Sequence, residues 1–224
     1  MQNQYRVFVV KTQYEEWKNN VYIVADIHTR DAIIIDPSWD EKKIEDIIDS
    51  NNLMPKAILI THSHYDHINV LREVEQFYSI PAYLGEHEKI EECMRDVNIR
   101  LISDGERLNL GSIQVEAHET AGHSKGSICY KIGDNFFSGD TLFVEGCGIC
   151  DNDESAGTLF DSVQKIKKIA GNHIKVFPGH TYWAEPGQSM DYLYKNNIYL
   201  SINEKKEFVK FRMRKKQRSL FDFK

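Results

Sequence analysis

The chain has 224 residues, of which 41% are hydrophobic, and its formal net charge at pH 7 is −6. This length suits one large domain, and no stretch approaches the ~18 apolar residues that a membrane-spanning helix requires. Residues 1–5 lack the basic region and the apolar stretch of a secretory signal, so we expect a cytoplasmic protein without a membrane segment.

The first third of the chain alternates strand-type and helix-type patterns. Three short runs rich in β-forming residues predict strands at residues 5–10, 21–25 and 32–35. Asp40 then has the position of an N-cap for a helix that carries isoleucines on one face and ends near Asn51 and Asn52. The apolar run at residues 57–60 predicts a further, buried strand.

The segment that follows this strand gathers four ligand-type side chains within six residues, namely His62, His64, Asp66 and His67. Imidazole nitrogen and carboxylate oxygen suit zinc, iron or manganese. His62 and His64 are two residues apart, so on an extended segment they point the same way. Asp66 and His67 come after a turn and can face a second point. One short segment could therefore serve two metal ions.

The rest of the chain predicts a second round of helices and strands. A helix is expected at residues 69–78, with an apolar side made of Leu71, Val74, Phe77 and Tyr78. Strands are expected at residues 113–117, 127–132 and 135–137, and a Gly133-Asp134 turn makes the last two a hairpin. A helix at residues 155–170 follows, with Gly171 at its C-cap. Two such rounds predict two packed sheets covered by helices on the outside.

Three further ligand-type residues each follow a glycine and a short β-rich or apolar run: His123, Asp140 and His180. Glycine at such a place lets the backbone turn sharply and approach a site closely. Ligands that recur at strand ends build a site along one edge of a sheet. His118, on a strand five residues before His123, is expected beside the site or on the surface.

The four cysteines include Cys147 and Cys150, which have the Cys-x-x-Cys spacing of redox and zinc sites. One such pair is a weak signal, because no second pair completes a four-sulfur site. Cytosolic cysteines are usually reduced. We expect this pair to have a structural role in a loop.

The order His-x-His-x-Asp-His, Gly-His, Ser-Gly-Asp-Thr and Pro-Gly-His resembles that of the metallo-β-lactamase-fold hydrolases, most closely their glyoxalase II branch. The resemblance covers about residues 5–200 and implies an α/β (α+β) fold, the four-layer αββα sandwich. It implies two zinc ions, with iron or manganese as alternatives. The first ion would be held by His62, His64 and His123. The second would be held by Asp66, His67 and His180, with Asp140 bridging both.

Two such ions predict hydrolysis. A hydroxide held between zinc ions becomes a nucleophile at neutral pH, and the ions stabilise the oxyanion that forms. Asp66 and Asp140 are the carboxylates expected to take part. A thioester suits this site, since its thiolate is a good leaving group.

Three positions bear on the substrate and are candidates to line the pocket. In glyoxalase II enzymes a lysine and a tyrosine of one loop hold glutathione, and the matching residues here are Ile149 and Asp151. Tyr182 does match a glutathione-contacting tyrosine of that family. With an apolar and an acidic residue in place of a cation and a phenol, glutathione is not the expected carrier.

The C-terminal tail differs in charge from the rest of the chain. Residues 201–224 carry a net charge of +6, whereas residues 1–200, the hydrolase domain, carry −12. A basic patch near a thioesterase site would attract an acidic partner. Arg212, Arg214 and Lys215 are therefore candidates to dock an acyl carrier protein. The simpler interpretation is an amphipathic helix that packs on the same domain.

The ligand set, the Glu-Gly-Cys-Gly loop and the tail resemble, more closely still, the stand-alone zinc-dependent hydrolases of bacterial trans-acyltransferase polyketide clusters. This resemblance implies removal of acyl groups from carrier proteins. Glyoxalase II and lactonase activities remain as alternatives, as does an iron-dependent persulfide oxygenase. Nucleic-acid processing is not expected, because the chain has no room for the extra domain. A non-catalytic binding protein is not expected either, because no ligand position is lost.

Overall fold

The computed structural model describes residues 4–214, which form two six-stranded sheets. The first sheet has the order β1-β2-β3-β4-β5-β6 and the second has the order β12-β11-β10-β9-β8-β7. The strands of the first sheet are β1 (Tyr5–Tyr14), β2 (Trp17–Asp26), β3 (Asp31–Ile35), β4 (Met54–Leu59), β5 (Ala82–Gly85) and β6 (Ile99–Ile102). Those of the second are β7 (Arg107–Leu110), β8 (Ile113–Glu119), β9 (Ile128–Ile132), β10 (Asn135–Gly139), β11 (Lys175–Pro178) and β12 (Gln188–Ser189).

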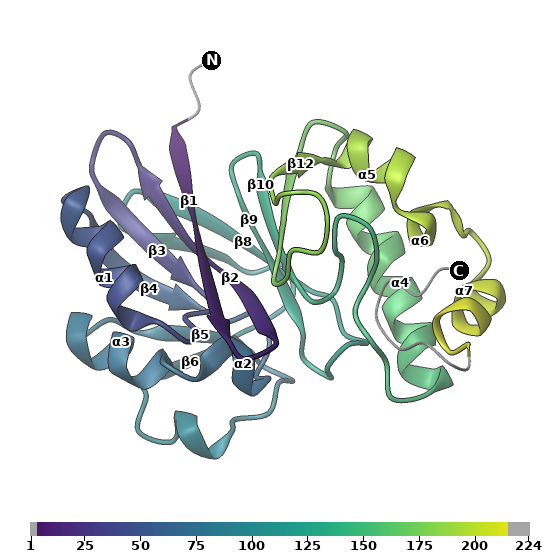
Figure 1. Cartoon of the computed structure of the whole chain (residues 1–224), viewed down its shortest axis with the longest axis horizontal. Helices are drawn as coiled ribbons and strands as arrows, with labels where there is room; N and C mark the ends of the chain where they lie inside the picture. The colour runs from purple at the N-terminus through teal and green to yellow at the C-terminus, as the bar shows by residue number, and fades with distance from the viewer. Residues whose placement is uncertain (1–3, 215–224) are drawn as a thin grey trace.

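Helices cover the outer face of each sheet, and the two inner faces meet (Figure 1). The helices are α1 (Glu41–Ser50), α2 (Tyr65–Ile68), α3 (Leu71–Tyr78), α4 (Asp153–Ile169), α5 (Met190–Asn196), α6 (Ile198–Ser201) and α7 (Lys205–Arg212), and one 3₁₀ turn, η1, spans Glu92–Met94. Buried residues form one core between the sheets and one under each helical layer. The expected four-layer αββα sandwich is confirmed.

The expected strands and caps are largely present. The β9–β10 hairpin forms around Gly133, and β1 and β2 form a long antiparallel hairpin. Asp40 caps α1, because its side chain accepts a hydrogen bond from the Lys43 amide at 3.1 Å. No helix in residues 4–214 has the length and apolar character to cross a membrane.

The helix predicted at residues 69–78 is confirmed as α3, which begins two residues later, at Leu71. Leu71 and Val74 are buried as expected, but Phe77 is 63% exposed, so it was wrong as a member of the buried apolar side. The predicted C-cap of the next long helix was also wrong. Gly171 is not the C-cap of α4. Ala170 has that role in an extended conformation, so the chain leaves α4 toward β11 without a left-handed residue.

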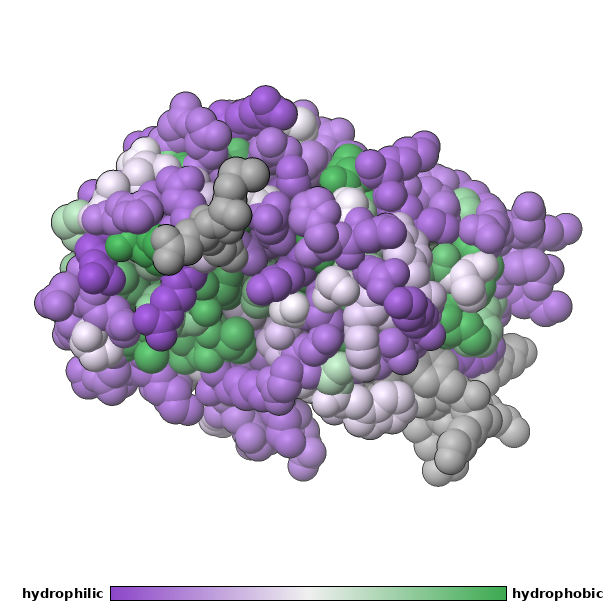
Figure 2. Space-filling view, turned by 90° about the horizontal axis from the view of Figure 1, so that it is seen from above, coloured by the Kyte–Doolittle hydropathy of each residue, from purple (hydrophilic) through white to green (hydrophobic). Residues whose placement is uncertain are grey.

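The described part of the tail packs on the domain through α7. Phe208 of α7 is fully buried, and its ring lies 5.4 Å from that of Phe160 on α4. Most of the face seen from the top of Figure 1 is hydrophilic, with smaller apolar areas between the polar side chains (Figure 2). The apolar side chains of α7 thus pack on α4, although the sequence of this segment is mainly basic.

Asp26 at the end of β2 ties the two sheets together, so Asp26→Asn should destabilise the fold. Its carboxylate accepts hydrogen bonds from Gln4, from the amides of His28 and Thr29, and from the Ser112 hydroxyl. Burial opposes the charge, but these bonds outweigh burial and lower the pKa of Asp26 to about 2. Asparagine cannot accept all of them.

We expect Asp26→Asn to lower the free energy of unfolding by about 1–2 kcal/mol at pH 7. Because the folded pKa lies below the ordinary value of 3.8, this contribution is complete above about pH 5 and is lost as the pH falls toward 2. Urea unfolding of both proteins at pH 7 and pH 3.5 measures it. Equal stability at pH 7 would contradict this role for Asp26.

Candidate metal centre

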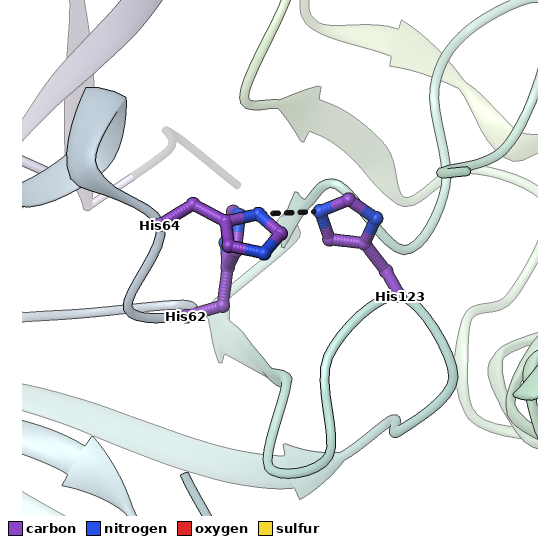
Figure 3. A group of neighbouring side chains, drawn as sticks. All are labelled: His62, His64 and His123. Carbon is purple, nitrogen blue, oxygen red and sulfur yellow. Dashed lines mark hydrogen bonds between the residues drawn. The ribbon is translucent and has the colours of Figure 1, made fainter. Parts of the chain in front are cut away.

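Three imidazoles meet at the edge where the two sheets face each other. His62 and His64 follow β4, and His123 lies on the loop between β8 and β9 (Figure 3). A nitrogen of each ring lies within 4.8 Å of a nitrogen of the others, and His64 Nδ1 is 3.0 Å from His123 Nε2. The three rings therefore present nitrogens to one point.

Two carboxylates and two further imidazoles lie beside this triad. His180 Nε2 is 3.4 Å from Asp66 Oδ2 and 3.3 Å from Asp140 Oδ2. His67 Nε2 is 3.5 Å from both Asp66 Oδ2 and Asp140 Oδ1. Asp140 Oδ2 is also 3.7 Å from His123 Nε2, so its carboxylate lies between the two groups. The structure thus brings together all seven ligand positions expected from the sequence.

Strand ends and one tight glycine contact make this convergence possible. Asp140 directly follows β10, and His180 comes two residues after β11, which pairs with β10 in parallel. A Cβ on Gly179 would lie 2.4 Å from Asp140 Oδ1 and 2.5 Å from His67 Cε1. Any larger residue there would displace ligand side chains, which is why the backbone needs glycine at this approach.

In four of the imidazoles, the Nδ1 atom, which faces away from the cluster, contacts an oxygen atom of the protein. His62 Nδ1 contacts Thr61 Oγ1 (3.1 Å), His67 Nδ1 contacts Asp36 Oδ2 (3.1 Å), His123 Nδ1 contacts the Ile149 carbonyl (2.9 Å) and His180 Nδ1 contacts the Lys18 carbonyl (2.6 Å). A histidine fixed in this way presents its other nitrogen, Nε2, with its lone pair toward the centre. Such partners are typical of histidines that bind metals.

Asp36 and Asn19 support the site and were not foreseen from the sequence. Asp36 is 2% exposed and accepts hydrogen bonds from the Thr61 amide at 2.8 Å and hydroxyl at 2.6 Å, besides holding His67. Asn19 donates to Asp66 Oδ2 at 2.8 Å. Asp36 directly follows β3, so its place after a strand was the one available signal.

The donor atoms fit divalent cations. Within residues 4–214, His62 Nε2, His67 Nε2 and Asp140 Oδ1 are buried and have no hydrogen-bond partner. Buried polar atoms are rarely left unpaired, and three of them facing one centre fit a bound cation. Imidazole and carboxylate together suit zinc, iron or manganese.

Charge coupling within the cluster also favours a cation. Burial would raise the pKa of Asp140, but His180 and His67 outweigh it and hold that pKa well below its ordinary value. Burial would lower the pKa of His180, but Asp140 and Asp66 raise it well above the ordinary value. Burial and neighbouring imidazoles lower the pKa of His62 well below its ordinary value. A bound metal would take the place of protons on this cluster.

The three residues expected to contact the substrate do not all line the same pocket. A pocket of about 910 Å³ over the ligands is lined by Ile149 and Tyr182, whereas Asp151 is exposed and does not line it. The Ile149 side chain is 56% exposed, and its carbonyl holds His123. The Tyr182 ring lies 5.2 Å from that of Phe143. Of the three candidates, Asp151 instead lines a neighbouring hollow that it shares with His123.

The residues expected to dock a carrier protein also differ in their exposure to solvent. Arg212 is 4% exposed and donates to Tyr199 Oη (3.0 Å) and the Cys147 carbonyl (3.4 Å), so it was wrong as a surface docking residue. It instead lines the metal pocket. Arg214 is half-buried and lies over the Phe211 ring, and Lys215 falls outside the described residues.

The cysteine pair and His118 lie outside the ligand cluster. Burial raises the pKa of Cys147 to about 12 and that of Cys150 to about 11, and both are free thiols. They are therefore protonated at neutral pH and poor nucleophiles or ligands. The His118 ring packs against Phe136.

Comparisons with known proteins agree with this geometry. The chain is 42% identical over 225 residues to the probable polyketide biosynthesis zinc-dependent hydrolase BaeB of Bacillus velezensis, with all of both chains covered. It is 40% identical over 221 residues to PksB of Bacillus subtilis, which carries the same description, with 98% of each chain covered. A hydroxyacylglutathione hydrolase of Pelagibacter ubique is 32% identical over 168 residues, covering 73% of this chain and 67% of the relative.

Among solved structures, a metallo-beta-lactamase from Staphylococcus aureus superposes with a TM-score of 0.83 at 22% identity, covering 95% of this chain and 68% of that one. At that identity the likeness shows the fold alone. The family model described as the metallo-beta-lactamase superfamily matches residues 14–180, which include all seven ligand positions. With its fold, its ligand cluster and this match, the chain belongs to the metallo-beta-lactamase superfamily.

Proposed function

We propose that this protein is a zinc-dependent thioester hydrolase that removes acyl groups from acyl carrier protein in polyketide biosynthesis. The convergence of the seven candidate ligands, five of which line one open pocket, carries the proposal. The full-length similarity to BaeB and PksB supports the polyketide context. The proposal includes two zinc ions in each chain and a cytoplasmic location.

The positions of the residues suggest which of them would bind each ion. His62, His64 and His123 would hold one ion, and Asp66, His67 and His180 the other, with the Asp140 carboxylate between them. Zinc bound there would supply a Lewis acid for the carbonyl oxygen and would lower the pKa of a bound water to about 7. The fixed imidazoles keep the donor atoms in place, so little reorganisation is needed during the reaction.

A thioester is favoured because the site need not supply a strong general acid to a thiolate leaving group. The burial that stabilises neutral Tyr182 raises its pKa above its ordinary value, which makes this pocket phenol a hydrogen-bond donor rather than an acid at neutral pH. Glutathione is disfavoured, because Ile149 offers no cation and Asp151 lies outside the pocket.

A side-by-side assay on zinc-loaded protein tests the proposal. Acetyl acyl carrier protein, S-lactoylglutathione and a simple lactone would be supplied at equal micromolar concentrations, with products followed by mass spectrometry. We expect the carrier-protein thioester to have a kcat/KM at least about tenfold above the others, which corresponds to a difference of about 1.4 kcal/mol in transition-state stabilisation. Faster turnover of the glutathione thioester would indicate a glyoxalase II, and faster turnover of the lactone would indicate a lactonase.

A further inference from the structure

A second hollow of about 600 Å³ opens beside the metal pocket, and aromatic side chains form most of its wall. We call it the aromatic groove and define it by Tyr14, Trp17, Trp39, Tyr65 and Val70. Tyr14 and Trp17 come from the β1–β2 hairpin, and Tyr65 is the first residue of α2. Trp39 lies on the loop between β3 and α1, so three segments far apart in the sequence contribute to it.

The aromatic groove is continuous with the metal pocket. Trp17, Tyr65 and the ligand Asp66 line both hollows. Trp17 is 55% exposed, Tyr65 is 63% exposed and Tyr14 is 56% exposed. Large aromatic side chains gathered in a hollow beside a reaction centre are typical of a ligand-binding surface.

Contacts around Trp39 hold the groove in shape. The Tyr14 and Trp39 rings stack with centroids 5.1 Å apart, and Tyr65 meets Trp39 edge to face at 6.0 Å. Trp39 Nε1 donates to Asn19 Oδ1 at 2.7 Å, and Asn19 in turn donates to Asp66. The floor of the groove is therefore joined through Asn19 to a metal ligand.

The amide and the carboxylate that border the groove, those of Asn69 and Asp66, already have partners. Asn69 accepts a hydrogen bond from the Trp39 amide at 2.6 Å and donates to the Tyr65 carbonyl at 2.9 Å. Asp66 faces the ligand cluster. The charged residues Glu16, Lys18 and Arg212 line the metal pocket but not the groove. A polar thiol carrier would lose hydrogen bonds to water in the groove, whereas an apolar chain would gain burial.

We propose that the aromatic groove binds the apolar acyl chain of the thioester substrate, which makes the protein selective for acyl groups longer than acetyl. This inference rests on the proposed function. The metal pocket would hold the thioester carbonyl and the carrier arm. Each methylene that enters the groove should raise kcat/KM by about fourfold if it is fully buried.

The test compares chain lengths on one thiol. Acetyl, butanoyl, hexanoyl and octanoyl thioesters of pantetheine would be hydrolysed by the zinc-loaded protein and by the variants Trp17→Ala and Tyr14→Ala. We expect the octanoyl-to-acetyl ratio of kcat/KM to be at least about tenfold in the unaltered protein. In both variants the ratio should fall by at least about fivefold. Phe77→Ala removes a similarly exposed aromatic ring on α3, outside the groove, and should keep the ratio.

A binding measurement separates the groove from the reaction. S-octylpantetheine, a thioether that cannot be hydrolysed, should bind the zinc-loaded protein at least about tenfold more tightly than S-ethylpantetheine by calorimetry. Trp17→Ala should abolish this preference. If the preference is present while no thioester is hydrolysed, binding of an apolar chain in the groove is supported and the proposed hydrolase function is contradicted. Equal binding of the two thioethers, or a preference unchanged in Trp17→Ala, would overturn the groove.

Discussion

Replacing Asp140 with asparagine should remove most bound zinc and lower hydrolysis by about a thousandfold or more. The Asp140 carboxylate lies within 3.7 Å of the Nε2 atoms of His67, His123 and His180. Asparagine keeps the volume but removes the negative charge, and it turns an NH₂ donor toward at least one of these nitrogens. The two groups of candidate ligands would lose the anion that lies between them.

Zinc content by mass spectrometry and kcat with a carrier-protein thioester measure this effect. Asp31→Asn is a matched control, because Asp31 is also a buried carboxylate, 8% exposed, but pairs with Lys56 and the Ser112 amide away from the ligands. It should keep both zinc content and activity. An Asp140→Asn protein that is fully metallated and active would show that this carboxylate does not join the two ligand groups.

Asp36→Asn should weaken zinc binding by about 10–100-fold without removing any ligand. Asp36 touches no expected ion position and instead accepts hydrogen bonds from His67 Nδ1 and from the Thr61 amide and hydroxyl. Its backbone has φ of 51°, a conformation that asparagine tolerates well. The substitution therefore leaves the chain path intact but replaces one of the two acceptor oxygens with an NH₂ donor, so the side chain can no longer accept from both His67 Nδ1 and the Thr61 amide.

Competition with a zinc chelator at pH 7 would give the affinities of the Asp36→Asn protein and of the unaltered protein. A loss of affinity together with an unchanged far-ultraviolet circular dichroism spectrum would assign Asp36 a positioning role. Asp31→Asn again provides the control for a buried carboxylate elsewhere. Identical zinc affinities would mean that His67 keeps its orientation by packing alone.

The clustering of the seven candidate ligands could be predicted because four of them lie within six residues and the others follow glycines after β-rich or apolar runs. Their supporting groups could not. Two of these, the Lys18 and Ile149 carbonyls, belong to the backbone, so residue type says nothing about them. Asp36 depends on β3 pairing with β4 in parallel, which brings the ends of the two strands together.

The aromatic groove was beyond prediction for a similar reason. Tyr14, Trp39 and Tyr65 are far apart in the sequence, and each alone reads as an ordinary surface or core aromatic. Their meeting depends on the β1–β2 hairpin reaching over α2, which is a property of the assembled sandwich.

The tail shows how a charge pattern can mislead. The net positive charge of the tail predicted exposed cations, but the apolar residues of α7 pack on α4, and Arg212 is buried with them. Its guanidinium lies 5.7 Å from the centre of the Tyr199 ring and donates to the Tyr199 hydroxyl, which compensates for burial. The amphipathic helix was the simpler interpretation of the sequence, but only the packing partner decides which side chains face solvent.

The most direct test of the account is a zinc titration of metal-free protein, with hydrolysis of an acyl carrier protein thioester followed by mass spectrometry at each addition. We predict no hydrolysis without metal, and an activity that rises to its maximum when two equivalents of zinc are bound. Hydrolysis by the metal-free protein, or none by the fully loaded protein, would contradict the proposal that this site is a zinc-dependent thioester hydrolase.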